Sequence, residues 1–162
     1  MIVRNEGGII VGVTIIGAIA LGVSLQNHKV STRDLFDDIG KRYEVEPPLL
    51  RAIQLVENPK GLRIATLNEN GTRDYGLMQI NEKTLKHYKI PESVWLEDAA
   101  SIDTAGRYMG DTRKELGSIF NIFNWIAAYN IGVPAVKTHG IQGGSYTGAV
   151  YYHYLMFKFA NA

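Results

Sequence analysis

The segment from Phe120 to Asn130 is apolar on nearly every side when it is placed on a helix, and it restricts the fold more than any other stretch. A helix that lacks a polar face has to be enclosed by other elements of a core. The segment therefore predicts a central buried helix in a mainly α domain. Asn130 stands just before Gly132, so it can cap the helix end or face a ligand, and both roles stay open.

Apolar residues at helical spacing and the usual helix-end signals predict further helices around this one. Ser31 or Thr32 can cap the first helix, and Pro47-Pro48 suits the first turn of the second. The remaining predicted helices cover residues 82–88, 98 or 101 to 117 and 149–159, and residues 133–139 are predicted to form a short helix or a turn. Turn residues indicate a polar loop or short hairpin over residues 60–73 and a flexible polar rim over residues 140–148.

The composition limits the classes of function. A length of 162 residues suits one domain of ordinary size. The net charge of +1 gives no electrostatic basis for binding nucleic acid. Cysteine is absent, which excludes disulfides and thiolate chemistry, and the four histidines lack metal-ligand spacing. We therefore expect neither a cofactor nor a metal.

The run from Gly7 to Leu25 contains no charged residue over its 19 positions. This length is close to the ~20 residues that a helix needs to cross a bilayer. Ala18-Ile19-Ala20 also fits a signal-peptide cleavage site, and a helix buried in a protein assembly is a third interpretation. We favour a retained apolar helix inserted into a membrane, with residues 1–30 as anchor and link and residues 31–162 as the functional domain. The few flanking charges do not fix its orientation.

Glu57 stands at the C-terminal end of the second predicted helix, on the same face as Leu50 and Ile53. Burial on this face raises the pKa of a carboxyl group because it disfavours the anion. The negative end of the helix dipole acts in the same direction. A carboxylic acid that stays protonated near neutral pH suits general-acid cleavage of a glycosidic bond. The alternative is a glutamate paired with a nearby arginine at a fraying helix end.

The stretch from Asp74 to Asn81 is a largely apolar, strand-like run that contains Gly76 and one amide side chain, Gln79. Glycine permits an unusual φ or the close approach of another segment. Such a run fits the floor of a cleft in which Gln79 holds a polar ligand. A buried strand whose Gln79 faces solvent is the alternative interpretation.

Three short motifs together resemble the lysozyme-like domain of lytic transglycosylases. In that family, a helix ending in Glu-Ser is followed by Gly-Leu-Met-Gln-Ile and then by Ala-Ala-Tyr-Asn-x-Gly. The same order appears here as Glu57-Asn58, Gly76 to Ile80 and Ala127 to Gly132, and the likeness extends from about Ser31 to the C-terminus. Asn58 replaces the usual serine, and the loop over residues 61–74 is less like the family.

The resemblance implies a lysozyme-like helical domain that cleaves the β-1,4 bond between N-acetylmuramic acid and N-acetylglucosamine in peptidoglycan glycan strands. Glu57 would be the catalytic acid and base, and the product would carry a 1,6-anhydro end without help from a second carboxylate. The family's final helix holds a tyrosine that contacts this acid, for which Tyr151 is the best match and Tyr152 the alternative. The residues expected to bind substrate are Asn58, Gly76, Met78, Gln79, Tyr129, Asn130 and Tyr151.

Two other activities remain compatible with these motifs. One is a lysozyme-type hydrolase of the same bond, in which Asp74 or Glu69 activates a water molecule. The other is a non-catalytic, peptidoglycan-binding or structural component of a virion or secretion assembly. Two locations are expected: a membrane, in which residues 7–25 anchor the protein with its domain facing the periplasm, or a phage virion.

Overall fold

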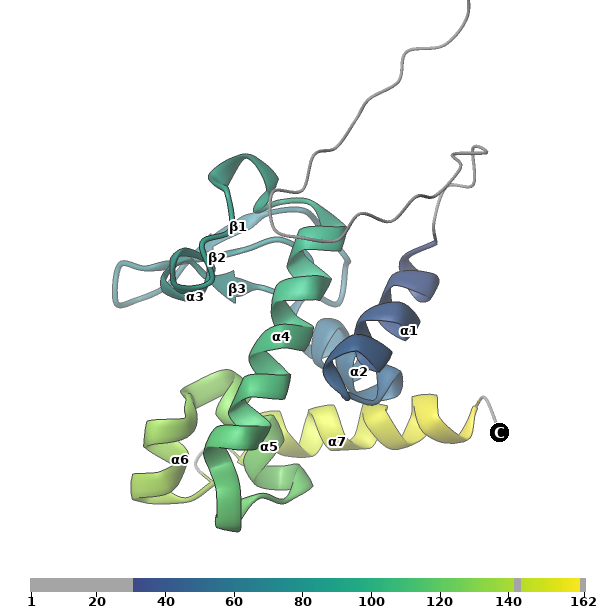
Figure 1. Ribbon diagram of the computed structural model, residues 1–162, viewed down its shortest axis with the longest axis vertical. Helices are drawn as coiled ribbons and strands as arrows, with labels where there is room; N and C mark the ends of the chain where they lie inside the picture. Colours follow the sequence, from purple (N-terminus) through teal and green to yellow (C-terminus); the bar gives the residue numbers. More distant parts are fainter. Residues whose placement is uncertain (1–30, 142–143, 161–162) are drawn as a thin grey trace, which may run out of the picture.

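The computed structural model describes residues 31–141 and 144–160, and Figure 1 shows helices gathered around one long helix, with a small sheet at one end. The helices are α1 (Thr32–Tyr43), α2 (Pro47–Glu57), α3 (Glu82–His87), α4 (Asp98–Leu116), α5 (Ile122–Ile131), α6 (Val133–His139) and α7 (Gly144–Phe159). The 3-10 turns are η1 (Glu92–Val94) and η2 (Gly117–Ile119), and the strands are β1 (Ala65–Leu67), β2 (Arg73–Tyr75) and β3 (Ile80–Asn81). The predicted mainly α architecture with a small hairpin region is confirmed.

The described part of the chain begins with the helix cap that the sequence predicts. The Ser31 hydroxyl accepts a hydrogen bond from the Asp34 backbone N–H, and the Asp34 carboxylate accepts one from the Ser31 N–H, both at 3.2 Å. The predicted apolar helix over residues 7–25 lies outside the described residues. Within residues 31–141 and 144–160, no helix combines the length and the apolar character needed to cross a membrane.

The core centres on α4, whereas the sequence predicts α5 as the central helix. α4 contacts α1, α2, α5, α6 and β3, and Figure 1 shows it running through the middle of the domain. Its buried Gly106 lets α1 approach closely, since a Cβ there would collide with Ile39. In α5, Phe123 remains 41% exposed, and Phe120 precedes the helix. An all-apolar sequence cannot reveal which of its faces the neighbouring helices leave open.

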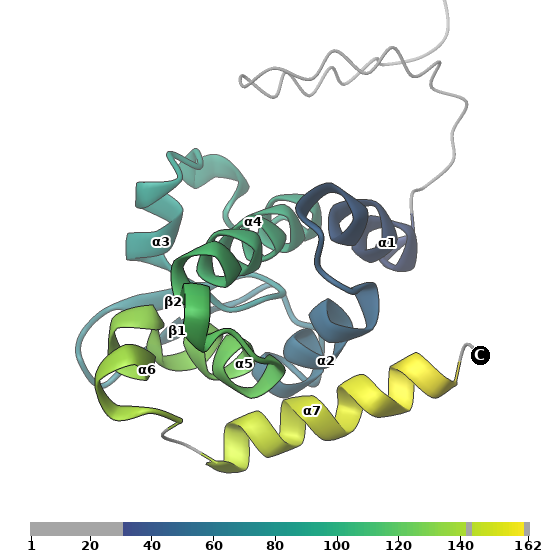
Figure 2. The ribbon, with the colours of Figure 1, turned by 60° about the horizontal axis from the view of Figure 1, so that its bottom comes forward.

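α2 and α7 lie side by side and run antiparallel, as Figure 2 shows. At one end of this pair, Tyr146 of α7 contacts Glu57 at the end of α2. At the other end, Tyr154 contacts Glu46, the N-cap of α2. The pair therefore places the beginning of the last helix against the acid that the sequence singles out.

The last helix starts earlier than the sequence predicts. α7 begins at Gly144, within the segment expected to form a flexible polar rim, and not at residue 149. Gly144 and Gly148 both have low helix propensity, which hides these turns from pattern analysis. Thr147 is buried and Tyr146 half-buried, so packing against the rest of the domain stabilises the additional turns.

The strands form an antiparallel sheet in the order β1-β2-β3. Asp74 pairs with Asn81 and Tyr75 with Ile80, so residues 76–79 form a tight turn between β2 and β3. The prediction of one continuous strand-like run over residues 74–81 is therefore wrong. The chain reverses here because the residues at both ends of the turn have positive φ, 72° at position 76 and 49° at position 79.

Candidate active site

Glu57 is the last residue of α2, and its carboxyl group meets the first turns of α7. Leu50 and Ile53, on the same helical face, are fully buried, and Glu57 is half-buried beyond them. The Tyr146 hydroxyl donates a hydrogen bond to Oε1 of Glu57 at 2.6 Å. The helical face identified from residue spacing is thus the face that the structure buries.

These surroundings raise the pKa of the Glu57 carboxyl group. Burial is the largest cause, since it removes water from the anion. The hydrogen bond from Tyr146 acts in the opposite direction because it stabilises the anion, and the negative charge of Asp74 adds to the rise. The net effect favours the protonated acid, in the direction that the sequence predicts.

The tyrosine that contacts Glu57 is Tyr146, which corrects the predicted contact with Tyr151. The Tyr151 ring instead packs against Phe123, with ring centroids 4.8 Å apart. The alternative, Tyr152, is 60% exposed on the outer side of α7. The sequence predicts the wrong tyrosine because it begins the last helix at residue 149, whereas α7 begins at Gly144 and includes Tyr146.

Helical spacing in the sequence could have identified Tyr146 as a residue on the buried face of the last helix. Tyr146, Val150 and Tyr154 follow one another at i, i+4 and i+8, and the last two are buried. Burial and the charge of Glu57 raise the pKa of Tyr146 far above the ordinary value of a phenol. Its hydroxyl therefore keeps its proton and serves as a hydrogen-bond donor to the acid.

The turn between β2 and β3 requires glycine at position 76. Gly76 has a φ of 72°, and an added Cβ would lie 2.8 Å from the Trp95 carbonyl oxygen and 3.0 Å from Ser101 Oγ. The unusual φ and the close approach, which the sequence suggests separately, occur together here. Gly76 thereby seats the turn against the beginning of α4.

The Met78 backbone is held by protein groups on both sides. Its N–H donates to Ser101 Oγ at 2.9 Å, and its carbonyl oxygen accepts from the Tyr129 hydroxyl at 2.8 Å. The side chain is fully buried. A sugar could therefore reach only the second lone pair of the carbonyl oxygen.

Gln79 ties the turn to β1. Its Oε1 accepts from the Thr66 hydroxyl at 2.6 Å, and its Nε2 donates to the Gly76 carbonyl oxygen at 2.8 Å. One Nε2 hydrogen is left for another partner. The side chain is half-buried, and its φ of 49° is uncommon for a residue other than glycine. Backbone strain of this kind is typical of functional sites.

The two asparagines of the motifs do not join this cluster. Asn58 is 5% exposed; its Nδ2 donates to the Leu62 carbonyl oxygen at 2.6 Å, and its Oδ1 accepts from the Leu62 N–H at 3.0 Å. This amide braces the loop that leaves α2. Asn130 is exposed near the end of α5, and no hydrogen bond within the described residues links it to the other candidates. The candidates that the structure brings together are Glu57, Gly76, Met78, Gln79 and Tyr129.

Asp74 is a second carboxyl group whose charge reaches this cluster. It lies in β2, and its Oδ1 accepts from Asn81 Nδ2 at 2.7 Å. Its negative charge raises the pKa of both Glu57 and Tyr129, in each case together with burial as the largest cause.

Polar contacts between segments far apart in sequence, such as the one from Ser101 to the β2-β3 turn, leave no local pattern in the sequence that would predict them.

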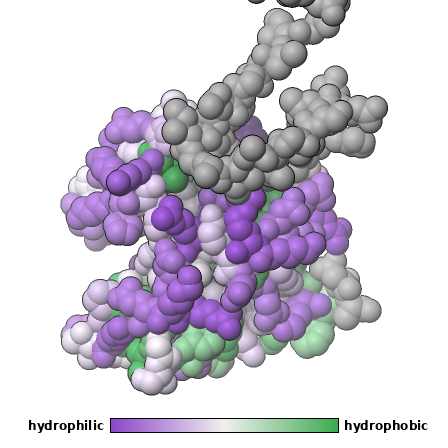
Figure 3. Space-filling model, in the orientation of Figure 1, coloured by the Kyte–Doolittle hydropathy of each residue, from purple (hydrophilic) through white to green (hydrophobic). Residues whose placement is uncertain are grey.

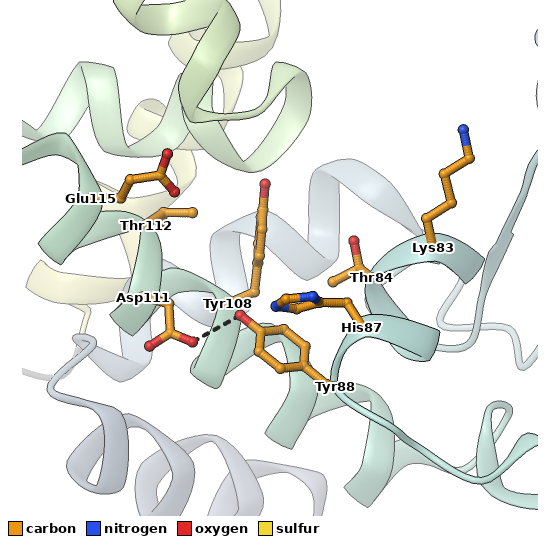
Figure 4. A pocket seen from close by; sticks show the side chains of 8 residues that line it. All are labelled: Lys83, Thr84, His87, Tyr88, Tyr108, Asp111, Thr112 and Glu115. Atoms are coloured by element: carbon orange, nitrogen blue, oxygen red, sulfur yellow. Dashed lines mark hydrogen bonds between the residues drawn. The ribbon is translucent and has the colours of Figure 1, made fainter.

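A separate pocket of about 340 Å³ lies between α3 and α4 (Figure 4). Tyr88 donates to Asp111 there at 2.9 Å. None of the candidate residues lines this pocket, and its carboxyl groups, Asp111 and Glu115, are exposed. A hollow without a desolvated acid lacks the group that glycosidic cleavage needs, so the candidate site is at Glu57.

Comparison with known proteins shows similarity in sequence. Residues 34–149 match the family model described as Transglycosylase SLT domain. Protein IpgF of Shigella flexneri is 28% identical over 127 residues, which cover 75% of this chain and 80% of that protein. The X polypeptide of Escherichia coli strain K12 is 26% identical over 144 residues, with 86% and 83% coverage. The match runs from α1 through Glu57 and the β2-β3 turn to the first turns of α7, and the chain therefore belongs to the Transglycosylase SLT domain family.

Proposed function

We propose that this protein is a peptidoglycan lytic transglycosylase. It cleaves the β-1,4 bond between N-acetylmuramic acid and N-acetylglucosamine, leaves a 1,6-anhydro end, and so opens the bacterial cell wall locally. The observation that supports this most directly is the half-buried Glu57, whose pKa is raised and whose Oε1 accepts a hydrogen bond from Tyr146. Membership of the family supports transglycosylase chemistry on peptidoglycan in general.

In this proposal Glu57 acts first as the acid and then as the base. Because Tyr146 occupies Oε1, Oε2 carries the transferable proton. The proton moves to the glycosidic oxygen while the bond from that oxygen to the anomeric carbon breaks, and the substrate's N-acetyl group stabilises the cationic carbon. The carboxylate then takes the proton of the muramoyl 6-hydroxyl, whose oxygen bonds to the anomeric carbon. No water is consumed, and Glu57 returns to its protonated form.

The β2-β3 turn supplies the sugar-binding edge beside the acid. Gln79 has one amide hydrogen left for a sugar oxygen, and the Met78 carbonyl oxygen has one lone pair left for a sugar hydroxyl. Tyr129 fixes this edge from α5, and the exposed Asn130 contacts the glycan farther along. In this arrangement Asn58 and Tyr151 support the site through packing and bracing.

Digestion of purified peptidoglycan, followed by mass spectrometry of the fragments, tests the proposal. The wild-type protein should release muropeptides with 1,6-anhydro ends, and Glu57→Gln should release none above background. A zymogram with the same two proteins separates catalysis from binding. A wild-type protein that binds sacculi but clears no zone would instead be a non-catalytic, peptidoglycan-binding component.

A lysozyme-type hydrolase is the second candidate, because the charge of Asp74 reaches Glu57 and its position is fixed by Asn81. Asp74 would then activate a water molecule that attacks the anomeric carbon. The fragments would end in reducing muramic acid, and the same mass spectra would show this. Glu69, the other possible activator, is exposed in the loop between β1 and β2.

We propose that residues 1–30 form an anchor and link, inserted in a membrane through residues 7–25, and that residues 31–162 form the domain facing the periplasm. A phage virion or a secretion assembly is the alternative setting. Deletion of residues 1–26 leaves the Ser31 capping box intact, so the truncated protein should remain soluble, monomeric and active on isolated sacculi. Aggregation, or a marked fall in melting temperature, would show that the deleted segment packs on the domain.

A further inference from the structure

The outer face of α7 carries a stripe of large apolar side chains that the domain does not cover. Tyr152, Met156 and Phe159 are 60%, 54% and 69% exposed. Their spacing of i, i+4 and i+7 places them on one side of the helix. Figure 3 shows apolar surface along the lower edge of the molecule, where Figure 1 places α7. Single exposed apolar residues are ordinary, but a contiguous stripe marks an interaction surface.

The last turn of α7, where this stripe ends, lies on the same side of the domain as the point where the described chain begins. Figures 1 and 2 both place the start of α1 and the last turn of α7 at the right-hand side. Only residues 26–30 separate the uncharged run that ends at Leu25 from Ser31, the cap of α1. Five extended residues reach at most about 17 Å, at ~3.4 Å each. A membrane-inserted run therefore holds this side of the domain close to the bilayer.

We propose that the stripe formed by Tyr152, Met156 and Phe159 docks the domain on the lipid surface beside its own anchor. Tyrosine with neighbouring apolar side chains suits the interface between headgroups and acyl chains. This inference rests on the proposed membrane insertion of residues 7–25 and is independent of the proposed catalysis.

Docking through the stripe also leaves the candidate site free. α7 extends from Tyr146, which contacts Glu57, to Phe159 at its other end. That part of the helix spans about 20 Å at 1.5 Å per residue. The stripe occupies only the second half of α7, so docking through it leaves the first turns, which contact Glu57, outside the docked surface.

Depth-dependent fluorescence quenching of the full-length protein tests the docking. The chain contains no cysteine, so Met156→Cys creates a single position for an environment-sensitive fluorophore. Leu67→Cys is the matched control, because Leu67 is 62% exposed in β1, away from the stripe. Both proteins are reconstituted into vesicles of phosphatidylethanolamine and phosphatidylglycerol with brominated acyl chains, and flotation first establishes insertion.

The expected result is that brominated lipid lowers the emission at position 156 by about half, whereas position 67 keeps nearly all of its intensity. Phe159→Cys should repeat the result at a second position of the stripe. Floated protein without quenching at either stripe position overturns the proposal. Energy transfer between labelled copies at position 156 assigns the stripe to a second copy of the chain and also overturns it. Failure to float overturns the anchor and the docking together, while lytic activity on isolated sacculi remains a separate measurement.

Discussion

The two ends of the α2–α7 pair contain the same two chemical groups, a glutamate and a tyrosine hydroxyl, yet their carboxyl groups respond in opposite ways. At one end Tyr146 donates to Glu57 at 2.6 Å, and at the other Tyr154 donates to Glu46 at 2.9 Å. The pKa of Glu57 is raised, whereas the pKa of Glu46 is lowered. A hydrogen bond from tyrosine therefore does not decide the protonation state of either acid.

A cation accounts for the difference. Burial is the largest single cause at both ends, and it acts to raise the pKa. At Glu46, the hydrogen bonds from Lys158 and Tyr154, together with the Lys158 charge, outweigh burial; the Lys158 Nζ lies 2.8 Å from Oε2. Among the described residues, Glu57 has no such cation, and Asp74 adds negative charge. The α2 dipole contributes to the same difference. Glu46 precedes the positive end of the helix, which lowers its pKa, and Glu57 occupies the negative end, which raises its pKa.

The largest expected effect comes from Glu57→Gln, which keeps the size of the side chain and removes the transferable proton. We expect the release of anhydro-muropeptides to fall by about 10³-fold or more. Glu46→Gln is the matched control at the other end of the helix pair, and it should stay within about twofold of wild type. Retention of more than a small fraction of wild-type activity by Glu57→Gln would exclude Glu57 as the acid.

The next largest difference should come from removing the hydroxyl of Tyr146 or of Tyr154, because only the first should change activity and its pH profile. Tyr146→Phe deletes the hydrogen bond that lowers the pKa of Glu57. The pKa should therefore rise further, and the alkaline limb of the kcat/KM profile should move to higher pH. The loss of orientation should lower kcat by about 10- to 100-fold. Tyr154→Phe should leave both the limb and kcat unchanged, and coincident profiles of the two variants would contradict the assignment.

Asp74→Asn should have a smaller effect and sharpens the electrostatic comparison. The substitution removes the negative charge that helps to raise the pKa of Glu57, so the alkaline limb should move to lower pH. The new amide oxygen can still accept from Asn81. In a transglycosylase, the maximal rate should remain within about threefold and the anhydro product should persist. A loss of about 100-fold or more would favour the hydrolase.

The smallest expected effects are on the free energy of unfolding. Its dependence on pH should have opposite signs for Glu57 and Glu46, at the two ends of the α2–α7 pair. Because the pKa of Glu57 is raised on folding, protonation of Glu57 stabilises the folded state. This contribution to the free energy of unfolding is fully present below the ordinary pKa of 4.5 and is lost as the pH rises through the raised pKa. Glu57→Gln should therefore gain melting temperature relative to wild type as the pH rises over that range. A constant difference across the range would contradict the raised pKa.

The lowered pKa of Glu46 has the reverse consequence, because its contribution is present above the ordinary value and is lost as the pH falls through the lowered pKa. Lys158→Met should remove this pH-dependent contribution of Glu46 to the free energy of unfolding. The side chains of Lys158 and Glu46 are 44% and 53% exposed, so solvent screens the pair. The cost at neutral pH should not exceed about 1 kcal/mol, as measured by chemical denaturation.

The sequence predicts the buried glutamate at one end of the pair, Glu57, but not the tyrosine that contacts it. The position of Glu57 follows from helical phase, because Leu50 and Ile53 on the same face must be buried. The unusual φ of Gly76 also follows from the sequence, because glycine permits a positive φ, but the tight turn in which it occurs does not. The sequence does not indicate Tyr146, because the first turns of α7 contain Gly144 and Gly148, which have low helix propensity. The resemblance implies that Asn58 contacts substrate, whereas in the structure its amide pairs with the Leu62 backbone.

The sequence by itself determined the helices with clear caps and periodicity, the order of the three motifs, and the burial of Glu57. These features depend on local geometry, which repeats along the chain and can be read from spacing. The tertiary structure alone decided that α4 is central, that Tyr146 meets Glu57, and that Lys158 neutralises Glu46. Such choices depend on contacts between residues far apart in sequence: 89 positions separate Tyr146 from Glu57, and 60 separate Tyr43 of α1 from Asp103 of α4. A local sequence pattern does not indicate which distant side chain will make the contact.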